Sequence, residues 1–257
     1  MLHKALPWMV PVGLLVAWQL ASRSALISAR ILPAPSDVFA AAGKMAASGE
    51  LFRHIGVSTA RAFAGFALGG SIGFLFGLLN GVSKTAARLL DSTFQMIRNV
   101  PHLALIPLFI LWFGIDERAK LYLVALGVFF PVYLNTYHGA RTVDAGLIEM
   151  GRVYGLTRTE LFRQVIFPGA LPSILVGVRF ALGIMWLTLI VAETIAATSG
   201  IGYMTMNARE FLQTDVVVLG ILMYALLGKL ADSGTVWLEK RCLAWHPSFA
   251  VEGAEAR

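Results

Sequence analysis

The stretch Gly139–Pro172 reads GARTVDAGLIEMGRVYGLTRTELFRQVIFPGALP, and it is a polar island in a mostly apolar chain. Apolar runs long enough to cross a bilayer flank this island on both sides. Within it, Glu149, Gly155 and Pro168 are spaced for a short helix, a glycine turn and a second short helix. A polar loop with this much local structure indicates a docking surface for a soluble partner.

The composition of the whole chain indicates an integral membrane protein. Of its 257 residues, 57% are hydrophobic and 14% are charged, whereas soluble domains carry about 25% charged residues. A helix needs roughly 20 apolar residues to cross a bilayer. We therefore predict an all-α fold with about six transmembrane helices. They are Pro7–Leu26, Ala60–Gly81, Ser92–Phe113, Leu121–Tyr137, Pro172–Glu193 and Val216–Leu238.

These runs are apolar all round, which favours helices over barrel strands, because barrel strands alternate apolar and polar residues. We expect residues 1–257 to form one transmembrane domain, with a core at about 55–240 and the polar loop at about 139–172. The first span is expected to be retained, because no clear cleavage site follows it. With the N-terminus inside, ten Lys and Arg residues fall inside and eight outside, which weakly favours a cytoplasmic island.

Charge and cysteine content exclude several classes of site. The net charge of +6 is assigned to membrane orientation and anionic lipid rather than to nucleic acid. The single cysteine, Cys242, excludes an internal disulfide and a site with several thiolate ligands. The five histidines are scattered and no carboxylates cluster, so we predict no catalytic site, no metal site and no cofactor.

Glycines recur every fourth residue along the second expected span. Such a row makes a flat helix face against which another helix can pack closely. Packing within one subunit is the favoured interpretation, and a contact between two copies of the chain is the alternative. The row consists of Gly65, Gly69, Gly73 and Gly77.

Prolines mark two further features. Pro33 and Pro35 are expected to block a helix, so that Ser36 or Asp37 caps a new amphipathic helix over residues 37–55. Pro101 and Pro107 lie inside the third expected span, where interior prolines free carbonyl groups and kink a helix. A broken helix that lines a pathway and a plain packing kink are both open as interpretations.

The island itself carries helix start and stop signals. Asp144 is placed to cap a first helix that runs to about Tyr154, and Gly155 is placed to stop it. Thr157 and Glu160 have the spacing of a capping box, which starts a second helix. Pro168 and Pro172 are expected to end that second helix. One face of the first helix is expected to be apolar and exposed: Leu147, Met150, Gly151 and Tyr154.

The island resembles the EAA loop of ABC importer permeases, in which a glutamate, a glycine and a proline stand at fixed spacings. The matching positions are Glu149-Met150-Gly151, then Gly155, then Val165, Phe167 and Pro168. Met150, Val165 and Phe167 depart mildly from the family's residue types. The resemblance implies that this loop couples the permease to an ATPase through Glu149, Met150, Gly151, Tyr154, Gly155 and Pro168.

Similar stretches cover nearly the whole chain, among them ILPAPSDV and SGIGYMTMNAREFLQTDVVVLG. They resemble the nitrate/sulfonate/taurine group of permeases, and within it the aliphatic sulfonate branch. This implies a type I ABC importer permease fold with a cytoplasmic coupling helix, in the bacterial inner membrane. It also implies three partners: cytosolic ATPase subunits, a periplasmic substrate-binding protein, and a second permease copy in a homodimer.

Polar residues inside the expected spans are the candidates for a translocation pathway, because charges inside a membrane are costly. Arg98 and His102 are spaced to share one face of the third span, where they could attract an anion or, for Arg98, reach the headgroups. Arg179 carries the same two interpretations. Glu193 is assigned a structural or gating role. Lys229 and Asp232 are placed to neutralise each other.

The predicted function is therefore the permease subunit of an ATP-driven importer of aliphatic sulfonates. The chain has no Gly-x-x-x-x-Gly-Lys-[Ser/Thr] phosphate loop, so ATP hydrolysis is expected in a separate subunit and the chain is not expected to be an enzyme. Taurine, nitrate or another small solute remains open as the cargo. A self-sufficient secondary transporter and a membrane-embedded enzyme are the alternatives from other classes.

Overall fold

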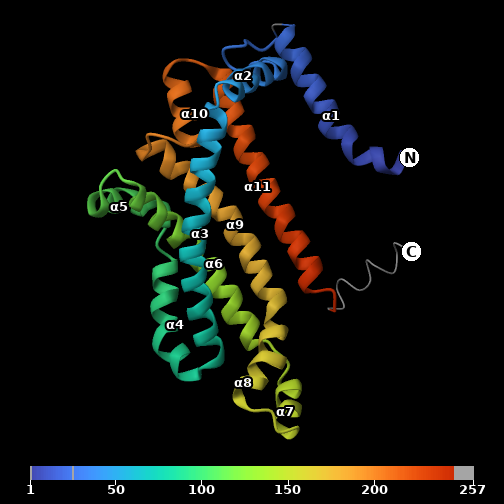
Figure 1. Cartoon of the computed structure of the whole chain (residues 1–257), viewed down its shortest axis with the longest axis vertical. Coiled ribbons are helices and arrows are strands. Elements are labelled where there is room, and N and C mark those ends of the chain that lie inside the picture. Colours follow the sequence, from blue (N-terminus) through green and yellow to red (C-terminus); the bar gives the residue numbers. More distant parts are fainter. Residues whose placement is uncertain (1, 25, 246–257) are drawn as a thin grey trace. The chain divides into compact units, whose positions relative to one another are not determined.

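The computed structural model describes residues 2–24 and 26–245, apart from the side chains of residues 2–8 and 196. Every regular element among these residues is a helix (Figure 1). In chain order they are α1 (Leu2–Arg23), α2 (Pro35–Ala47), α3 (Glu50–Val82), α4 (Lys84–Arg98), η1 (His102–Leu105), α5 (Ile106–Phe113), α6 (Glu117–Arg141), α7 (Ala145–Val153), α8 (Arg158–Leu161), η2 (Phe162–Ile166), α9 (Phe167–Ala196), α10 (Ile201–Glu210) and α11 (Thr214–Cys242).

Four helical stretches in the described residues are long and apolar enough to cross a membrane. They are α3, α6, the continuous stretch Arg158–Ile195 and α11. A bent pair, α4 with His102–Phe113, makes a fifth if it counts as one span. The first expected span falls on α1, whose opening side chains lie outside the described residues. The fold is thus the predicted all-α membrane fold.

The third expected span is broken rather than merely kinked, so the first of the two alternatives for its prolines holds for the backbone. Its two halves are bent by 78°. The break falls at Pro101, which lies outside both helices with an extended backbone (φ −62°, ψ 109°). Proline lacks the N–H that would continue the helix and disfavours helical backbone in the residue before it. Pro107 does not kink α5, because it lies in the first turn, where no N–H is needed.

The expected amphipathic helix over residues 37–55 is also divided. Its first part is α2, which begins at Pro35 after Ala34 with no side-chain cap, so the predicted capping by Ser36 or Asp37 was wrong. Pro35 occupies the first helical position, where its fixed φ favours the helix rather than blocking it. Gly49, at φ +80°, then separates α2 from α3.

The chain divides into two compact units. The first comprises Met1–Ala60 and Ile190–Leu226, and the second comprises Arg61–Leu189 and Leu227–Arg257. Helices α3, α9 and α11 contribute residues to both units. The expectation of one domain over residues 1–257 stays a prediction.

The second unit is built around a close contact between α3 and α6. A Cβ atom on Gly69 would lie 2.0 Å from the carbonyl oxygen of Ala125, and one on Gly73 would lie 2.5 Å from that of Phe129. Gly65, Gly77 and Gly81 also lie against α6, since a Cβ atom on each would come within 3.0 Å of the side chain of Val124, Thr136 or Ala140, respectively. The glycine face is therefore filled by a helix of the same chain, which confirms the prediction of internal packing.

Polar contacts also fasten α3 to α6. The guanidinium group of Arg61 pairs with the carboxylate of Glu117, which also accepts a hydrogen bond from Lys120 Nζ at 3.1 Å. Toward the other end of α3, Asn80 Nδ2 donates to Tyr133 OH at 2.8 Å. Arg61, Lys120, Asn80 and Tyr133 are all buried, so they are held by partners rather than by water.

Candidate functional site

The polar island folds as a helical elbow between α6 and α9, formed by α7 and α8 (Figure 1). Asp144 caps α7 by accepting a hydrogen bond from Gly146 N at 2.7 Å. Helix α7 ends at Val153, and Gly155 follows with φ +77°, a backbone conformation that L side chains rarely adopt. The predicted start and stop of this helix are confirmed.

The second half of the elbow begins with the predicted capping box. Thr157 Oγ1 accepts from Glu160 N, and Glu160 Oε2 accepts from Thr157 N at 2.8 Å. Pro168 and Pro172, however, do not end this helix. The chain continues from α8 through a π-helical turn, Phe162–Ile166, into α9. Pro168 lies in the first turn of α9 and Pro172 lies inside it, where the chain continues as helix.

One side of α7 presents large apolar side chains to solvent. Val153 is 86% exposed and Tyr154 is 79% exposed, and about half of the surface of Leu147 and Met150 is exposed. Gly151 does not share this face, so that expectation was wrong. It is buried, and a Cβ atom there would lie 2.8 Å from Leu161. Val153 was missed, although its position three residues after Met150 could have revealed it.

The remaining predicted coupling residues have different surroundings. Glu149 lies on α7 and is exposed. Gly155 forms the turn between α7 and α8, and a Cβ atom there would meet nothing within 4 Å. Its requirement for glycine is therefore conformational and not steric. Pro168 belongs to the spanning helix rather than to the elbow.

A cavity of about 520 Å³ lies in the first unit, and one of about 330 Å³ lies in the second. The smaller cavity brings Arg98 and His102 together, although they do not share a helix face, because Arg98 ends α4 and His102 begins η1. His102 Nε2 lies 3.1 Å from the buried Thr188 Oγ1. Gly127 leaves room for both, since a Cβ atom there would lie 2.9 Å from that oxygen. Asn135 is a further polar lining residue, and the other side chains are apolar: Val100, Phe130, Pro131, Leu134, Phe180 and Ile184.

Arg179 lies outside that cavity and belongs to a charged triad on α9 and α11. Its Nε lies 2.6 Å from Asp232 Oδ1, and Lys229 Nζ lies 3.4 Å from Asp232 Oδ2. The predicted pairing of Lys229 with Asp232 is confirmed, and Arg179 is a further partner. Arg179 and Lys229 are both exposed.

Glu193 lies in the first unit and is 1% exposed. Its carboxylate accepts hydrogen bonds from Ser58 and Tyr224. No sequence signal connects these residues, because Ser58 and Glu193 are 135 positions apart. Among the described residues, no group of three or more His, Cys, Asp or Glu side chains is arranged to hold a metal ion.

Helices long and apolar enough to span a membrane, with a structured polar elbow between two of them, define an integral membrane protein. The chain belongs to the family of binding-protein-dependent transport system inner membrane components, whose sequence profile matches residues 69–243.

Similar curated proteins cover almost the whole chain. It is 60% identical over 98% of its length to the aliphatic sulfonates transport permease SsuC of Escherichia coli K12, of which it covers 96%. It is 46% identical to SsuC of Bacillus subtilis 168, covering 96% of this chain and 91% of the relative. The taurine transport system permease TauC of Escherichia coli K12 is 37% identical, over 91% of this chain and 86% of its own.

Solved structures with the same fold come from ABC transporters. A chain of an amino acid ABC transporter matches with a TM-score of 0.61 at 17% identity, over 77% of this chain and 97% of its own. A chain of the inward-facing MetNI methionine ABC transporter matches with a TM-score of 0.57 at 20% identity, over 72% of this chain and 94% of its own. At this level of identity the likeness concerns the fold alone.

Proposed function

We propose that this chain is the permease subunit of an ATP-driven importer that carries aliphatic sulfonates across the inner membrane. The observation that carries the proposal is the exposed apolar face of α7, held on a capped elbow between two spans. The identity of 60% to SsuC of Escherichia coli supports the choice of cargo. A separate ATPase would supply the energy, since the sequence has no phosphate loop.

The elbow is suited to receive that ATPase. Apolar side chains exposed at this density are a liability unless a partner covers them, and tyrosine, the residue type of Tyr154, is among those enriched at the centres of protein interfaces. The caps at Asp144 and Thr157 hold α7 and α8 in shape. Because α8 continues through the π turn into α9, a displacement of the elbow would be transmitted directly to a spanning helix.

This assignment also orients the spans. Helix α9 starts at Phe167, directly after the elbow, and Glu193 lies 26 residues farther along it. At 1.5 Å per residue this is about 39 Å, which exceeds the roughly 30 Å thickness of the hydrocarbon core. If the elbow is cytoplasmic, the end of α9 that carries Glu193 reaches the opposite side of the membrane.

The cavity of about 330 Å³ that Arg98 and His102 line is chemically suited to an anion with an apolar chain. Arg98 and His102 can face the sulfonate group, while Phe130 and Phe180 line the space for an alkyl chain. The triad at Arg179 requires polar surroundings, because its two cations, Arg179 and Lys229, are exposed and charges that face lipid are costly. A second permease copy, enclosing a watery pathway between two sets of spans, would provide them.

Reconstitution of the permease with its ATPase tests the proposal. We expect proteoliposomes to accumulate hexanesulfonate only when ATP and a loaded sulfonate-binding protein are supplied. Uptake that proceeds without ATP would instead establish a secondary transporter. Uptake of taurine or nitrate in place of hexanesulfonate, with matching binding proteins, would retain the importer and reassign its cargo.

Arg98→Gln is expected to lower the rate of hexanesulfonate uptake about fivefold, because Arg98 is exposed and a cation beside an anion at an exposed site contributes up to about 1 kcal/mol. Assembly with the ATPase should stay unchanged. Arg88→Gln is the matched control, since Arg88 lies on the same helix and outside this cavity. Equal uptake by the two variants would show that Arg98 serves only to reach the headgroups.

A further inference from the structure

The buried carboxylate of Glu193 accepts hydrogen bonds from several segments of the first unit of the chain. Glu193 Oε2 accepts hydrogen bonds from Ser58 Oγ at 2.7 Å, from Gly202 N at 2.9 Å and from Tyr224 OH at 3.0 Å. Ser58, Glu193 and Tyr224 belong to α3, α9 and α11, which are the three helices that contribute residues to both units. We call this set of contacts the Glu193 clasp. Within the first unit, it ties the three helices to one another.

The Glu193 clasp also holds the start of α10. Three successive backbone N–H groups, from Gly200, Ile201 and Gly202, each donate to a side chain. Their acceptors are His54 Nδ1 at 3.1 Å, Ser58 Oγ at 2.8 Å and Glu193 Oε2 at 2.9 Å, in that order. The first N–H groups of a helix have no partner within it, so these side chains fix both the position and the direction of α10.

The loop before α10 approaches the carboxylate too closely for any side chain. A Cβ atom on Gly200 would lie 2.3 Å from Glu193 Oε1, and one on Gly202 would lie 2.5 Å from Glu193 Cβ. Gly200 also has φ +111°. The glycines of the Gly200-Ile201-Gly202 sequence therefore allow the backbone to pack directly against the side chain of Glu193.

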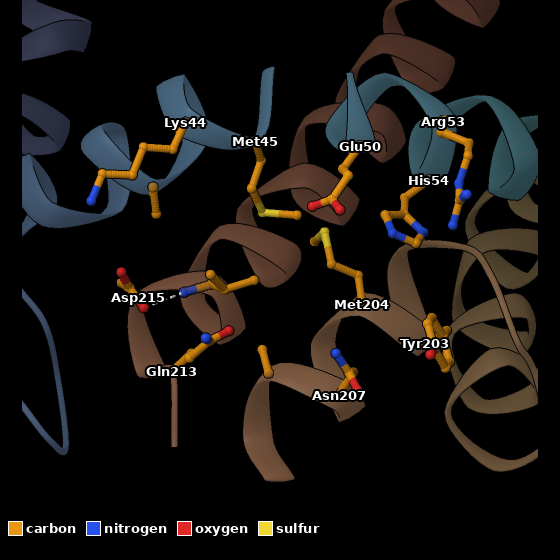
Figure 2. Close-up of a pocket in the computed structure, with 13 residues that line it drawn as sticks. Lys44, Met45, Glu50, Arg53, His54, Tyr203, Met204, Asn207, Gln213 and Asp215 are labelled. Atoms are coloured by element: carbon orange, nitrogen blue, oxygen red, sulfur yellow. Dashed lines mark hydrogen bonds between the residues drawn. The ribbon is translucent and has the colours of Figure 1, made fainter. Parts of the chain in front are cut away.

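Helix α10 forms one wall of the larger cavity, of about 520 Å³ (Figure 2). Tyr203 and Asn207 come from α10, and Lys44 and Arg53 come from the opposite wall, formed by α2 and the start of α3. His54 belongs to both features, because it lines the cavity and accepts the hydrogen bond from Gly200. A displacement of α10 would therefore change the shape of this cavity.

The polar groups of this cavity are available to a partner. Among the described residues, the side chains of Lys44, Arg53, Asn207 and Gln213 form no hydrogen bond or ion pair with one another or with the rest of the protein. Glu50 and the sulfur atoms of Met45 and Met204 lie between the basic groups (Figure 2). The charges are of both signs and do not converge on one point, which fits a polypeptide segment with acidic and basic side chains better than a small anion.

We propose that Glu193 is a positioning residue for transport. The Glu193 clasp holds α10 as one wall of an extracytoplasmic cavity, and this cavity receives a charged loop of the periplasmic substrate-binding protein. The proposal rests on the proposed function, which places this end of α9 outside the cytoplasm. Docking in the cavity would act on α10 and, through the Glu193 clasp, on the three helices together. Docking of a loaded substrate-binding protein would in this way displace the spanning helices.

The test compares ATP hydrolysis by the complete importer in proteoliposomes with and without a hexanesulfonate-loaded binding protein. Glu193→Gln keeps the shape of the side chain but replaces one accepting oxygen by a donor. We expect it to lower the maximal stimulation about tenfold, while basal hydrolysis and the binding protein concentration at half-stimulation stay within about twofold of wild type. Arg53→Glu, in the cavity, is expected to raise that concentration about tenfold and leave maximal stimulation unchanged.

Two further variants keep the outcome decisive. Tyr224→Phe removes one donor to the carboxylate and retains the ring, so we expect about a threefold loss of maximal stimulation even if Glu193→Gln does not assemble. Thr194→Ala is the matched control, because Thr194 Oγ1 bonds only to the Val191 carbonyl of its own helix. Wild-type stimulation in Tyr224→Phe would overturn the proposal, whereas wild-type importer that shows no stimulation at all would overturn the proposed function instead.

Discussion

Gly69→Ala is expected to lower the unfolding temperature of the purified permease by about 5 °C or more, because it forces apart two helix backbones in a packed interior. The new Cβ atom would lie 2.0 Å from the Ala125 carbonyl oxygen, where ordinary contact requires at least 3.4 Å. A backbone atom cannot swing aside as a side chain can. Separating the two helices would also loosen the neighbouring contacts of Gly65 and Gly73 with α6.

Gly70→Ala provides the control on the same turn of α3. A Cβ atom at Gly70 would meet Val128 Cγ1 at 3.7 Å and Phe66 Cε1 at 3.8 Å, and both are ordinary contacts. Alanine also favours a helix over glycine by up to about 1 kcal/mol, so this variant should be as stable as wild type or slightly more stable. Fluorescence-detected unfolding in detergent measures both. If Gly69→Ala were as stable as Gly70→Ala, the close contact between α3 and α6 would be refuted.

Tyr154→Ala is expected to weaken binding of the ATPase to the permease about thirtyfold, corresponding to the roughly 2 kcal/mol typical of a central aromatic residue at an interface. Tyr154 is 79% exposed and lies at the end of α7 beside the equally bare Val153. Because the side chain is so exposed, its removal should leave the fold of the elbow intact. The measurement is a titration of labelled ATPase against permease in lipid nanodiscs.

Thr159→Ala tests whether the effect is specific to the apolar face. Thr159 is exposed on α8 within the same elbow, and its side chain is polar and small. We expect this variant to bind the ATPase with wild-type affinity. Undiminished binding by Tyr154→Ala would place the docking surface elsewhere on the chain and would leave the apolar face of α7 unexplained.

The elbow was predictable from sequence because its determinants are local. Asp144, Gly155 and the pair Thr157 and Glu160 act on backbone groups within three residues of themselves. The prediction that Pro168 ends the helix failed for a related reason. A proline in the first turn is as compatible with a helix start as with a helix end, and only the preceding π turn decides between them.

The broken third span and the Glu193 clasp could not be predicted from local sequence signals. Pro101 predicted a disturbance, but a kink and a bend of 78° share the same sequence signal. Arg98 and His102 nevertheless reach one cavity, by folding of the chain rather than by helical spacing. Glu193 binds Tyr224, 31 positions away, and Ser58, 135 positions away. Such partners are selected by tertiary packing, which a single sequence does not encode in its periodicity.

The exposed apolar side chains of α7 also affect the lifetime of this protein in the cell. A subunit made in excess of the partner that covers Val153 and Tyr154 keeps an apolar patch in water at the membrane surface. Proteases and chaperones act on exposed apolar segments of this kind. Surplus copies would therefore be short-lived, and the abundance of the permease would follow that of its partner. Overproduction of the chain by itself would yield less intact protein than co-production of the two.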